Sequence, residues 1–132
     1  MMAAADDTGS GEGPGSVEDV IARFGAAWEA WDLEAVLALM APDGVFESTG
    51  PAPDGRRCEG ITAVRAEWEP MFRDTVDAQF RFEEAFVSGD RATARWVFSW
   101  TGDDGERGHV RGADVIRVRD GWVVEKFSYV KG

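Results

Sequence analysis

The chain of 132 residues has little from which to build a metal, redox or phosphate site. It contains one cysteine, Cys58, and one histidine, His109. A lone cysteine excludes an intrachain disulfide and fits a reducing cytoplasm, and one histidine cannot build a zinc site of the usual kind. No glycine-rich phosphate loop lies between a strand and a helix. We therefore expect no metal, no cofactor and a cytoplasmic location.

Long apolar runs and basic segments are also missing. No stretch approaches the roughly 18 apolar residues of a membrane span, and the N-terminus lacks the basic start and apolar run of a secretory signal. The net charge of −11 argues against nucleic acid and anionic membranes as partners. Residues 1–15 have almost nothing to bury and predict a disordered tail. Residues 16–132 are long enough for a single domain with one modest core.

In the first half of the chain, apolar residues recur at helical spacing in three segments. Ser16 is placed to cap a first helix, and Asp32 to cap a second, which Pro42 ends. A short strand over 45–49 and a loop rich in proline and glycine follow. A third helix is expected over about 61–72. The helices of this chain therefore precede most of its strands.

From Ala78 onward the apolar period changes to two, which is typical of half-buried strands. The acidic, glycine-rich run 101–108 predicts a hairpin loop. Asp120 and Gly121 form a strong signal for a two-residue hairpin turn. Three helices followed by antiparallel strands indicate an α+β fold.

One carboxylate stands on the apolar side of its strand. Asp114 alternates with Gly112 and Ile116, whereas His109 and Arg111 fall on the opposite side. An ionised carboxylate that is buried alone is costly, so it finds donors, changes its pKa or takes part in chemistry. Asp114 is therefore the first candidate for a functional residue, although a purely structural hydrogen bond to a Trp or Tyr side chain is an equal alternative.

The Asp120-Gly121 turn also predicts which residues face Asp114. If these two residues are central in the turn, Asp114 lies opposite Phe127, and the next inward pair brings in Tyr129. This register places Lys126 and Ser128 on the outer face. With aromatic rings around it and no cation on its face, Asp114 is expected to have a raised pKa.

Three segments carry a resemblance to a known family: "FGAAWEAWDLEAVLALMAPDGVFES", "CEGITAVRAEWEPMF" and "GADVIRVRDGWVVEKFSYV". In them the chain resembles the nuclear transport factor 2 superfamily, and within it the SnoaL-like branch, which includes ketosteroid isomerases and polyketide cyclases. The resemblance implies a cystatin-like α+β barrel, in which a cone-shaped, curved antiparallel sheet carries three helices on its concave face.

The resemblance also suggests functional positions. By similarity, Asp114 matches an aspartate that stabilises an oxyanion, Phe24 stands where the isomerases have a tyrosine, and Ser48, next to Glu47, stands where they have a base. We take Asp114 and Glu47 as catalytic candidates. The candidates for binding an apolar ligand are aromatic: Phe24, Trp28, Phe46, Trp68, Trp96, Phe98, Phe127 and Tyr129.

Two functions from different classes remain open. The first is a small-molecule-binding protein with an aromatic pocket that works as a cofactor-independent isomerase or aldol-type cyclase on a polycyclic or polyketide-like substrate. The second is a non-catalytic accessory module of the same fold. Both are compatible with a homodimer through the outer sheet face, because that face is expected to expose more apolar residues than a solvated sheet needs. These are Val97, Ala113, Val115, Trp122, Val124 and Val130.

Overall fold

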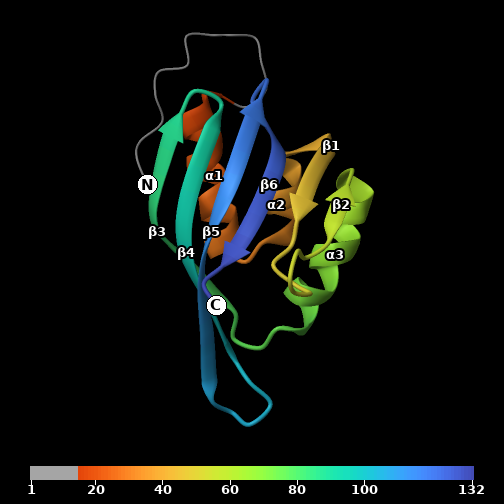
Figure 1. The fold of residues 1–132 in the computed structure, drawn as a ribbon, viewed down its shortest axis with the longest axis vertical. Helices are drawn as coiled ribbons and strands as arrows, with labels where there is room; N and C mark the ends of the chain where they lie inside the picture. Colours follow the sequence, from red (N-terminus) through yellow and green to blue (C-terminus); the bar gives the residue numbers. More distant parts are fainter. Residues whose placement is uncertain (1–14) are drawn as a thin grey trace.

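The computed structural model describes residues 15–132, and the predicted N-terminal tail lies outside the described residues except for Gly15. Its helices lie together on one face of a sheet (Figure 1). The helices are α1 (Val17–Glu29), α2 (Leu33–Ala38) and α3 (Ile61–Asp74). The strands are β1 (Met40–Glu47), β2 (Arg57–Glu59), β3 (Gln79–Ser88), β4 (Arg91–Thr101), β5 (Arg107–Arg119) and β6 (Trp122–Val130).

The two predicted helix caps are in place. The Ser16 hydroxyl accepts a hydrogen bond of 3.1 Å from the backbone N–H of Asp19, and the Asp32 carboxylate accepts one of 3.1 Å from that of Ala35. Each cap satisfies a backbone donor that the first turn of a helix leaves free. The second helix ends earlier than expected, because β1 begins at Met40 and pairs there with β6. Residues 45–47 of the predicted strand over 45–49 end β1, and residues 48 and 49 lie in the loop that follows.

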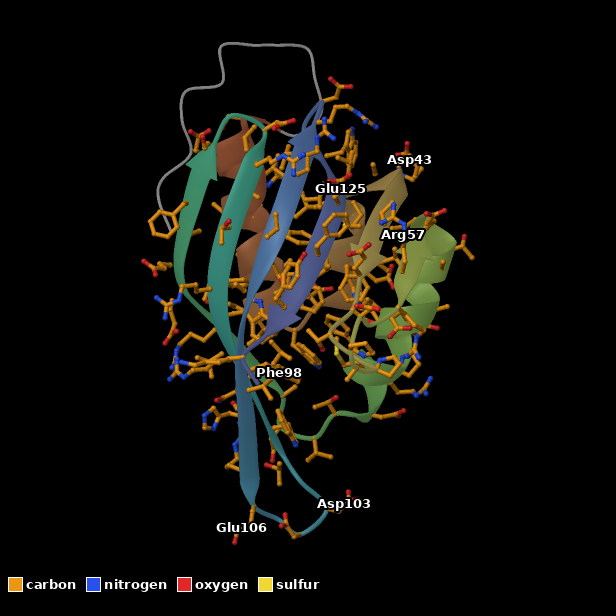
Figure 2. The ribbon with its side chains drawn as sticks, in the orientation of Figure 1. Asp43, Arg57, Phe98, Asp103, Glu106 and Glu125 are labelled. Atoms are coloured by element: carbon orange, nitrogen blue, oxygen red, sulfur yellow. The ribbon has the colours of Figure 1, made fainter. Side chains whose placement is uncertain are left out.

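The strands form one sheet in the order β2-β1-β6-β5-β4-β3. All neighbouring pairs are antiparallel except β1 and β6, which run parallel. These two strands are far apart in the chain, so no hairpin forces them to be antiparallel. The curved α+β architecture predicted for the chain is confirmed, with a mixed sheet that does not close. The hairpin of β4 and β5 projects beyond the rest of the sheet and carries Asp103 and Glu106 at its tip (Figure 2).

A bulge in β6 shifts the register that the last turn predicts. Val118 lies opposite Val123, as the turn requires, but Arg117 lies opposite Glu125, so Val124 has no partner. An extra residue in one strand moves every later side chain to the other face. Beyond the bulge, Asp114 therefore lies opposite Ser128 and not Phe127.

The predicted neighbours of Asp114 were therefore wrong. Lys126 and Ser128, which we placed outside, are buried on the inner face with Asp114. Phe127 and Tyr129 take the outer face instead, where Tyr129 is exposed. The bulge also buries Val124, which we expected on the outer face.

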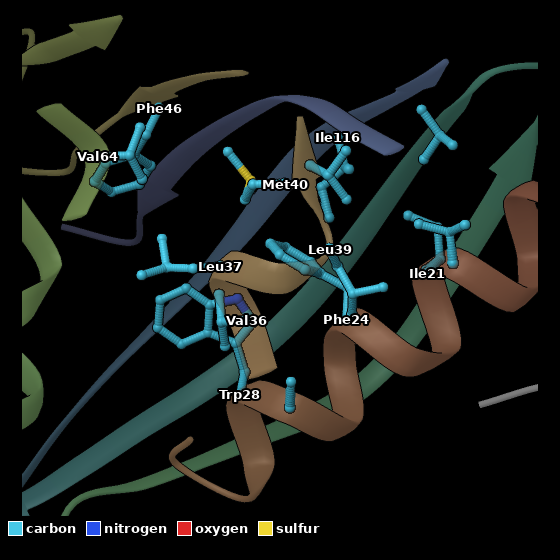
Figure 3. Packing of buried hydrophobic residues seen from close by; sticks show 14 of the residues in the cluster. Ile21, Phe24, Trp28, Val36, Leu37, Leu39, Met40, Phe46, Val64 and Ile116 are labelled. Atoms are coloured by element: carbon cyan, nitrogen blue, oxygen red, sulfur yellow. The ribbon is translucent and has the colours of Figure 1, made fainter. Parts of the chain in front are cut away.

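The core lies between the sheet and the helices (Figure 3). At one end it is mainly aliphatic, and its fully or nearly fully buried members include Val20, Ile21, Val36, Ile116, Val118 and Val123. Towards the other end it becomes aromatic. There Trp28 of α1 lies 4.9 Å from Trp68 of α3 and 5.3 Å from Phe80 of β3, measured between ring centroids. The candidate functional site lies at this aromatic end.

Candidate functional site

Three polar side chains meet on the inner face of β5 and β6. Lys126 Nζ donates a hydrogen bond of 2.7 Å to Ser128 Oγ, and Ser128 Oγ donates one of 2.6 Å to Asp114 Oδ1. Lys126 Nζ also lies 3.2 Å from Asp114 Oδ2, as an ion pair without hydrogen-bond geometry. Strand pairing explains the cluster, because Ser128 lies directly opposite Asp114 and Lys126 is two residues before Ser128. We call these three residues the polar cluster.

Aromatic rings enclose the lysine of the polar cluster. Its Nζ lies 4.9 Å from the centroid of the Trp28 ring, 4.9 Å from that of Phe46 and 5.8 Å from that of Trp68. At such distances the negative faces of the rings attract an ammonium group. The rings come from α1, β1 and α3, so three separate elements form one box around the end of Lys126.

Burial dominates the electrostatics of this lysine. Asp114 is 0% exposed and Lys126 is 3% exposed. Removing the ammonium group from water lowers the pKa of Lys126, and the neighbouring Asp114 carboxylate opposes this effect only in part. Lys126 is thus closer to releasing a proton than an ordinary lysine, while a proton acceptor stands beside it.

A cavity of about 260 Å³ opens next to the polar cluster. Lys126 and Ser128 line it, whereas Asp114 lies behind them and does not. The aromatic wall consists of Trp28, Phe46, Trp68, Phe80, Trp96 and Phe98, and Met71, Val110, Ser48, Thr49, Gly50 and Glu67 complete the lining. The cavity therefore combines an apolar wall with two convergent polar groups.

Three indole groups of the wall have unsatisfied donors. Nε1 of Trp28, Trp68 and Trp96 is buried and has no hydrogen-bond partner among residues 15–132. A buried donor without an acceptor costs about 1–3 kcal/mol, and such groups are rare in folded proteins. They mark this end of the core as one that lacks acceptors of its own.

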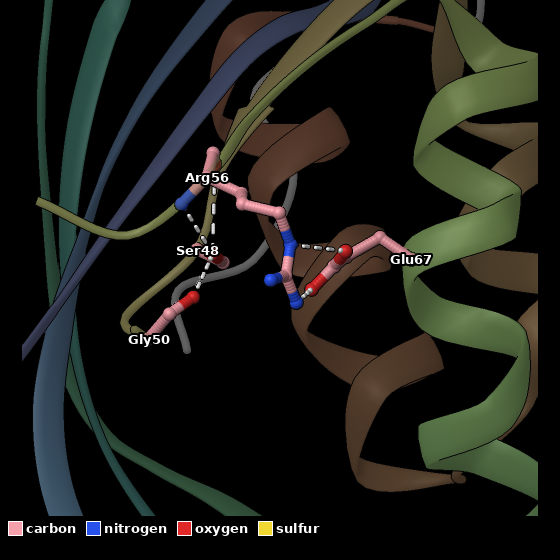
Figure 4. Close-up of polar contacts among 4 residues, drawn as sticks. All are labelled: Ser48, Gly50, Arg56 and Glu67. Carbon is pink, nitrogen blue, oxygen red and sulfur yellow. Dashed lines mark hydrogen bonds and ion pairs between the residues drawn. The ribbon is translucent and has the colours of Figure 1, made fainter. Parts of the chain in front are cut away.

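One edge of the cavity is formed by the loop that follows β1. The Ser48 hydroxyl accepts a hydrogen bond of 2.8 Å from the Arg56 backbone N–H and donates one of 2.7 Å to the Gly50 carbonyl (Figure 4). The Arg56 guanidinium reaches α3 and binds both carboxylate oxygens of Glu67 at 3.2 Å. These hydrogen bonds fix the loop to α3. Ser48, at the position that resembles the isomerase base, therefore holds the loop together by accepting one hydrogen bond and donating another.

The structure brings together some of the predicted site residues and separates others. Trp28, Phe46, Trp68, Trp96 and Phe98 line the same cavity. Phe24 is buried in the core behind it and contacts Trp28 edge to face.

Glu47 and the two aromatic residues of β6 lie elsewhere. Glu47 forms an ion pair of 2.7 Å with Arg57, and the Arg57 guanidinium also lies over the Phe127 ring, 5.9 Å from its centroid. Glu47 and Tyr129 line a second, larger pocket of about 490 Å³ that is bordered by the exposed loop of Thr49, Pro53 and Asp54. Ser128 lines this pocket as well as the aromatic cavity, so the two adjoin at Ser128, while Asp114 itself lines neither.

Polar residues of the cavity that are absent from the predicted site include Lys126, Ser128 and Glu67. The predicted register placed Lys126 and Ser128 on the outer face. Phe80, Met71 and Val110 are further lining residues that were not predicted as ligand contacts. The two adjacent valines, Val123 and Val124, are the only sequence feature near the bulge. Both are buried.

Residues 15–132 contain neither a metal-binding cluster of acidic, His or Cys side chains nor a membrane-spanning helix. No group of three or more His, Cys, Asp or Glu side chains in this part of the chain is arranged to hold a metal ion. No helix within it is both long enough and apolar enough to cross a membrane.

Comparison with known proteins gives a consistent family and fold. The family model described as SnoaL-like domain matches residues 21–126. A protein of unknown function from Mesorhizobium loti, described as NTF2-like, is 39% identical; the match covers 88% of this chain and 91% of that one, with a TM-score of 0.74. No curated protein matches the chain.

More distant structures share the fold alone. A proposed polyketide cyclase from Pseudomonas putida is 19% identical over 89% of this chain and 93% of its own, with a TM-score of 0.73. A proposed hydroxylase from Streptomyces galilaeus, AclR, is 20% identical over 87% of this chain and 78% of its own, with a TM-score of 0.70. Their different names show that this fold does not determine one reaction.

Proposed function

Because the chain belongs to the SnoaL-like domain family, we propose that its aromatic cavity binds a small apolar molecule through an oxygen atom held near Lys126. One observation carries the proposal: two buried polar side chains, Lys126 and Ser128, stand in the wall of an otherwise largely apolar cavity. Such a combination of apolar lining and a few convergent polar groups is typical of small-molecule sites. The unsatisfied indole donors nearby also favour a ligand that brings an acceptor.

The volume of the cavity limits the ligand. Sites for drug-sized molecules have volumes of about 300–1,000 Å³, and this cavity, at about 260 Å³, falls just below that range. It suits a molecule of roughly one or two rings. A larger polycyclic or polyketide-like substrate requires displacement of the loop that Arg56 and Glu67 hold in place.

The polar cluster supports acid/base chemistry on such a ligand. Lys126 donates a hydrogen bond to the oxygen of a carbonyl group and stabilises the enolate that forms on it. The proton lost by the neighbouring carbon goes to Glu67, the carboxylate that lines the cavity. Asp114, which contacts the cavity only through Ser128 and Lys126, holds the lysine in position and balances its charge. Isomerisation or aldol-type cyclisation without a cofactor fits these groups. Glu47 is not part of this chemistry, because its ion pair with Arg57 holds it outside the cavity.

Calorimetry with acetophenone, an aryl ketone of suitable size, tests the binding proposal. Val110→Trp fills the cavity from β5, whereas Glu106→Trp adds the same side chain at the exposed tip of the hairpin of β4 and β5 and serves as the control. We expect the first variant to weaken binding at least about tenfold, a loss of about 1.4 kcal/mol, and the second to bind as the wild type does. Equal affinities in the two variants would exclude this cavity as the binding site.

We also propose that two copies of the chain associate through the outer sheet face as a homodimer. This association does not depend on whether the protein is catalytic. Ala113 and Val115 form a partly exposed apolar area there, whereas Val97, which we expected to be exposed, is buried. The bulge adds Phe127 and Tyr129, the latter 57% exposed. The outer-face cations Arg95, Arg111 and Arg117 are paired with acids of the same chain, as Arg111 is with Glu83 at 2.9 Å. Their charges therefore do not oppose association.

Sedimentation at micromolar concentration tests the homodimer. A species of twice 14.4 kDa is expected, and Tyr129→Glu should convert it to the monomer while leaving the cavity intact. A monomer in the wild type would refute the association. Location in the cytoplasm stays a prediction, which fractionation of cells that express the chain tests.

A further inference from the structure

The buried amine of Lys126 offers a reaction that a hydrogen-bond donor alone does not. We propose that Lys126 is a covalent attachment site that condenses with the carbonyl carbon of a small aldehyde or ketone to form a Schiff base. The inference rests on the proposed function, because the same cavity must admit the carbonyl compound. It specifies the chemical class of the ligand and the atom to which it is joined.

The geometry around Nζ suits a nucleophile. A neutral amine carries two hydrogens and one lone pair. The hydrogen bond to Ser128 Oγ at 2.7 Å uses one hydrogen, and the contact with Asp114 Oδ2 at 3.2 Å occupies a second direction. No other hydrogen bond of this nitrogen is formed among residues 15–132, and Lys126 lines the cavity. The lone pair is therefore available to a carbon atom in the cavity.

The surroundings favour the neutral amine that this reaction needs. The aromatic box removes the amine from water, which lowers the pKa of Lys126 and activates a lysine as a nucleophile. Asp114 is the charged group in contact with Nζ and opposes this effect. The other carboxylate at the cavity, Glu67, is held by Arg56. The second lysine of the chain, Lys131, is exposed near the C-terminus and has no such environment.

The condensation balances without an oxidant or reductant. The Nζ lone pair forms a bond to the carbonyl carbon, and the C=O π electrons move to oxygen. One amine hydrogen passes to Ser128 Oγ while the Ser128 hydroxyl hydrogen passes to that oxygen, which gives a carbinolamine. The C–O bond then breaks, the second amine hydrogen leaves with the oxygen as water, and the nitrogen electron pair completes the C=N bond. Ser128 and Asp114 end the sequence in their starting states.

Reductive trapping with benzaldehyde and cyanoborohydride tests the proposal on the full chain at neutral pH. The reagent converts a Schiff base into a stable benzylamine, and the sequence contains only Lys126, Lys131 and the N-terminal amine as candidate sites. Peptide mapping by mass spectrometry then locates the benzyl group. We expect Lys126 to be labelled at least about tenfold faster than Lys131, although Lys131 is far more accessible. Labelling of Lys131 and the N-terminus without Lys126 would overturn the proposal.

Two variants sharpen the result. Lys131→Met should retain the fast label and Lys126→Met should lose it. Ser128→Ala keeps the lysine but removes the hydroxyl that relays the proton, so the label on Lys126 should form several-fold more slowly. An unchanged rate in Ser128→Ala would exclude the proton path, and with it the mechanism proposed here.

Failure of this inference is distinguishable from failure of the proposed function. If acetophenone binds wild type but not Val110→Trp, while Lys126 stays unlabelled by benzaldehyde, the cavity binds ligands non-covalently and the Schiff base is refuted. If acetophenone does not bind and Lys126 stays unlabelled, both proposals fail. Because the label is mapped on the wild-type protein, the decision does not depend on whether a variant folds.

Discussion

Two of the ion pairs on strand β5 differ in their surroundings far more than in their geometry. On the inner face, Asp114 lies 3.2 Å from Lys126, with side chains 0% and 4% exposed. Three residues further, on the outer face, Arg117 lies 3.0 Å from Asp90, with side chains 37% and 51% exposed. Water screens the outer pair, so its contribution to stability is small. The inner pair has lost its hydration, so each charge depends on the other.

The comparison teaches that the distance between two charges says little about their energetic importance. It also separates the two faces by role. On the outer face each of these charges has a hydrated partner, so removing one pair should change the free energy of unfolding little. On the inner face Lys126 lies next to a cavity, and burial lowers its pKa. The following predictions are ordered from the largest expected effect to the smallest.

Removing one member of the inner pair should have the largest effect. Asp114→Ala leaves Lys126 buried without its counter-ion, and breaking a buried pair in this way costs about 3–5 kcal/mol. Urea unfolding of the variant and the wild type measures the loss. The double variant Asp114→Leu/Lys126→Met removes both charges and should recover most of the stability, because apolar replacements of a buried pair are often neutral or stabilising. A single variant as stable as the wild type would contradict the account of the inner face.

A smaller loss of stability is expected when an added methyl group crowds the wall of the cavity at Gly112. A Cβ placed on Gly112 would collide with the ring of Trp96 and with the Tyr129 carbonyl oxygen. Gly112→Ala should therefore displace a ring of the cavity, at a cost of about 1–3 kcal/mol. Gly50→Ala is the matched control, because its Cβ would meet no atom within 4 Å. Thermal unfolding of both variants checks this, and equal losses would show that Trp96 is not fixed by this contact.

The sequence predicts the features that depend on local patterns, and it fails where the register between two strands decides. The caps at Ser16 and Asp32 and the inward side chain of Asp114 follow from local patterns, because each depends on a few neighbouring residues. The partners of Asp114 depend on the register across a hairpin. One unpaired residue, Val124, changes that register for the rest of β6.

The bulge itself leaves no clear mark in the sequence. Val123 and Val124 are both apolar, so either parity buries one of them, and the alternation that follows fits either face. The parity that puts Lys126 inside also conflicts with the general rule that lysine is exposed. Only the spatial fact that Asp114 stands opposite Ser128 resolves this conflict. The predicted aromatic residues of the cavity lie on α1, β1, α3 and β4, so the bulge in β6 does not change which way they face. Phe127 and Tyr129 follow the bulge and turn outward.

The pH dependence of stability distinguishes Lys126 from an exposed lysine. Its pKa in the folded state is lowered below the ordinary 10.5 of the unfolded chain, mainly by burial. Between those two values the unfolded chain binds more protons than the folded one, so the free energy of unfolding rises with pH across this window. The contribution of Lys126 is therefore least favourable below the folded pKa and levels off above 10.5.

Urea unfolding across the alkaline range measures this effect as a difference between variants. The stability of the wild type relative to Lys126→Met should rise with pH by at most about 1.4 kcal/mol per pH unit. Lys131→Met should keep the slope of the wild type, because Lys131 is exposed. All three proteins contain Cys58, whose own titration then cancels. A difference that falls with rising pH would mean that Asp114 raises the pKa of Lys126 more than burial lowers it.

The outer pair of β5 should give the smallest effect of all. Arg117→Met removes the contact with Asp90 but keeps a long apolar stem over the sheet, so the loss should stay below about 1 kcal/mol. Raising the salt concentration to about 1 M shortens the screening length to about 3 Å and should abolish even this difference. The loss in Asp114→Ala should survive the same salt, because the inner pair is closed to solvent. If salt reduced both losses equally, water would have access to the polar cluster, and the lysine would behave as a surface residue.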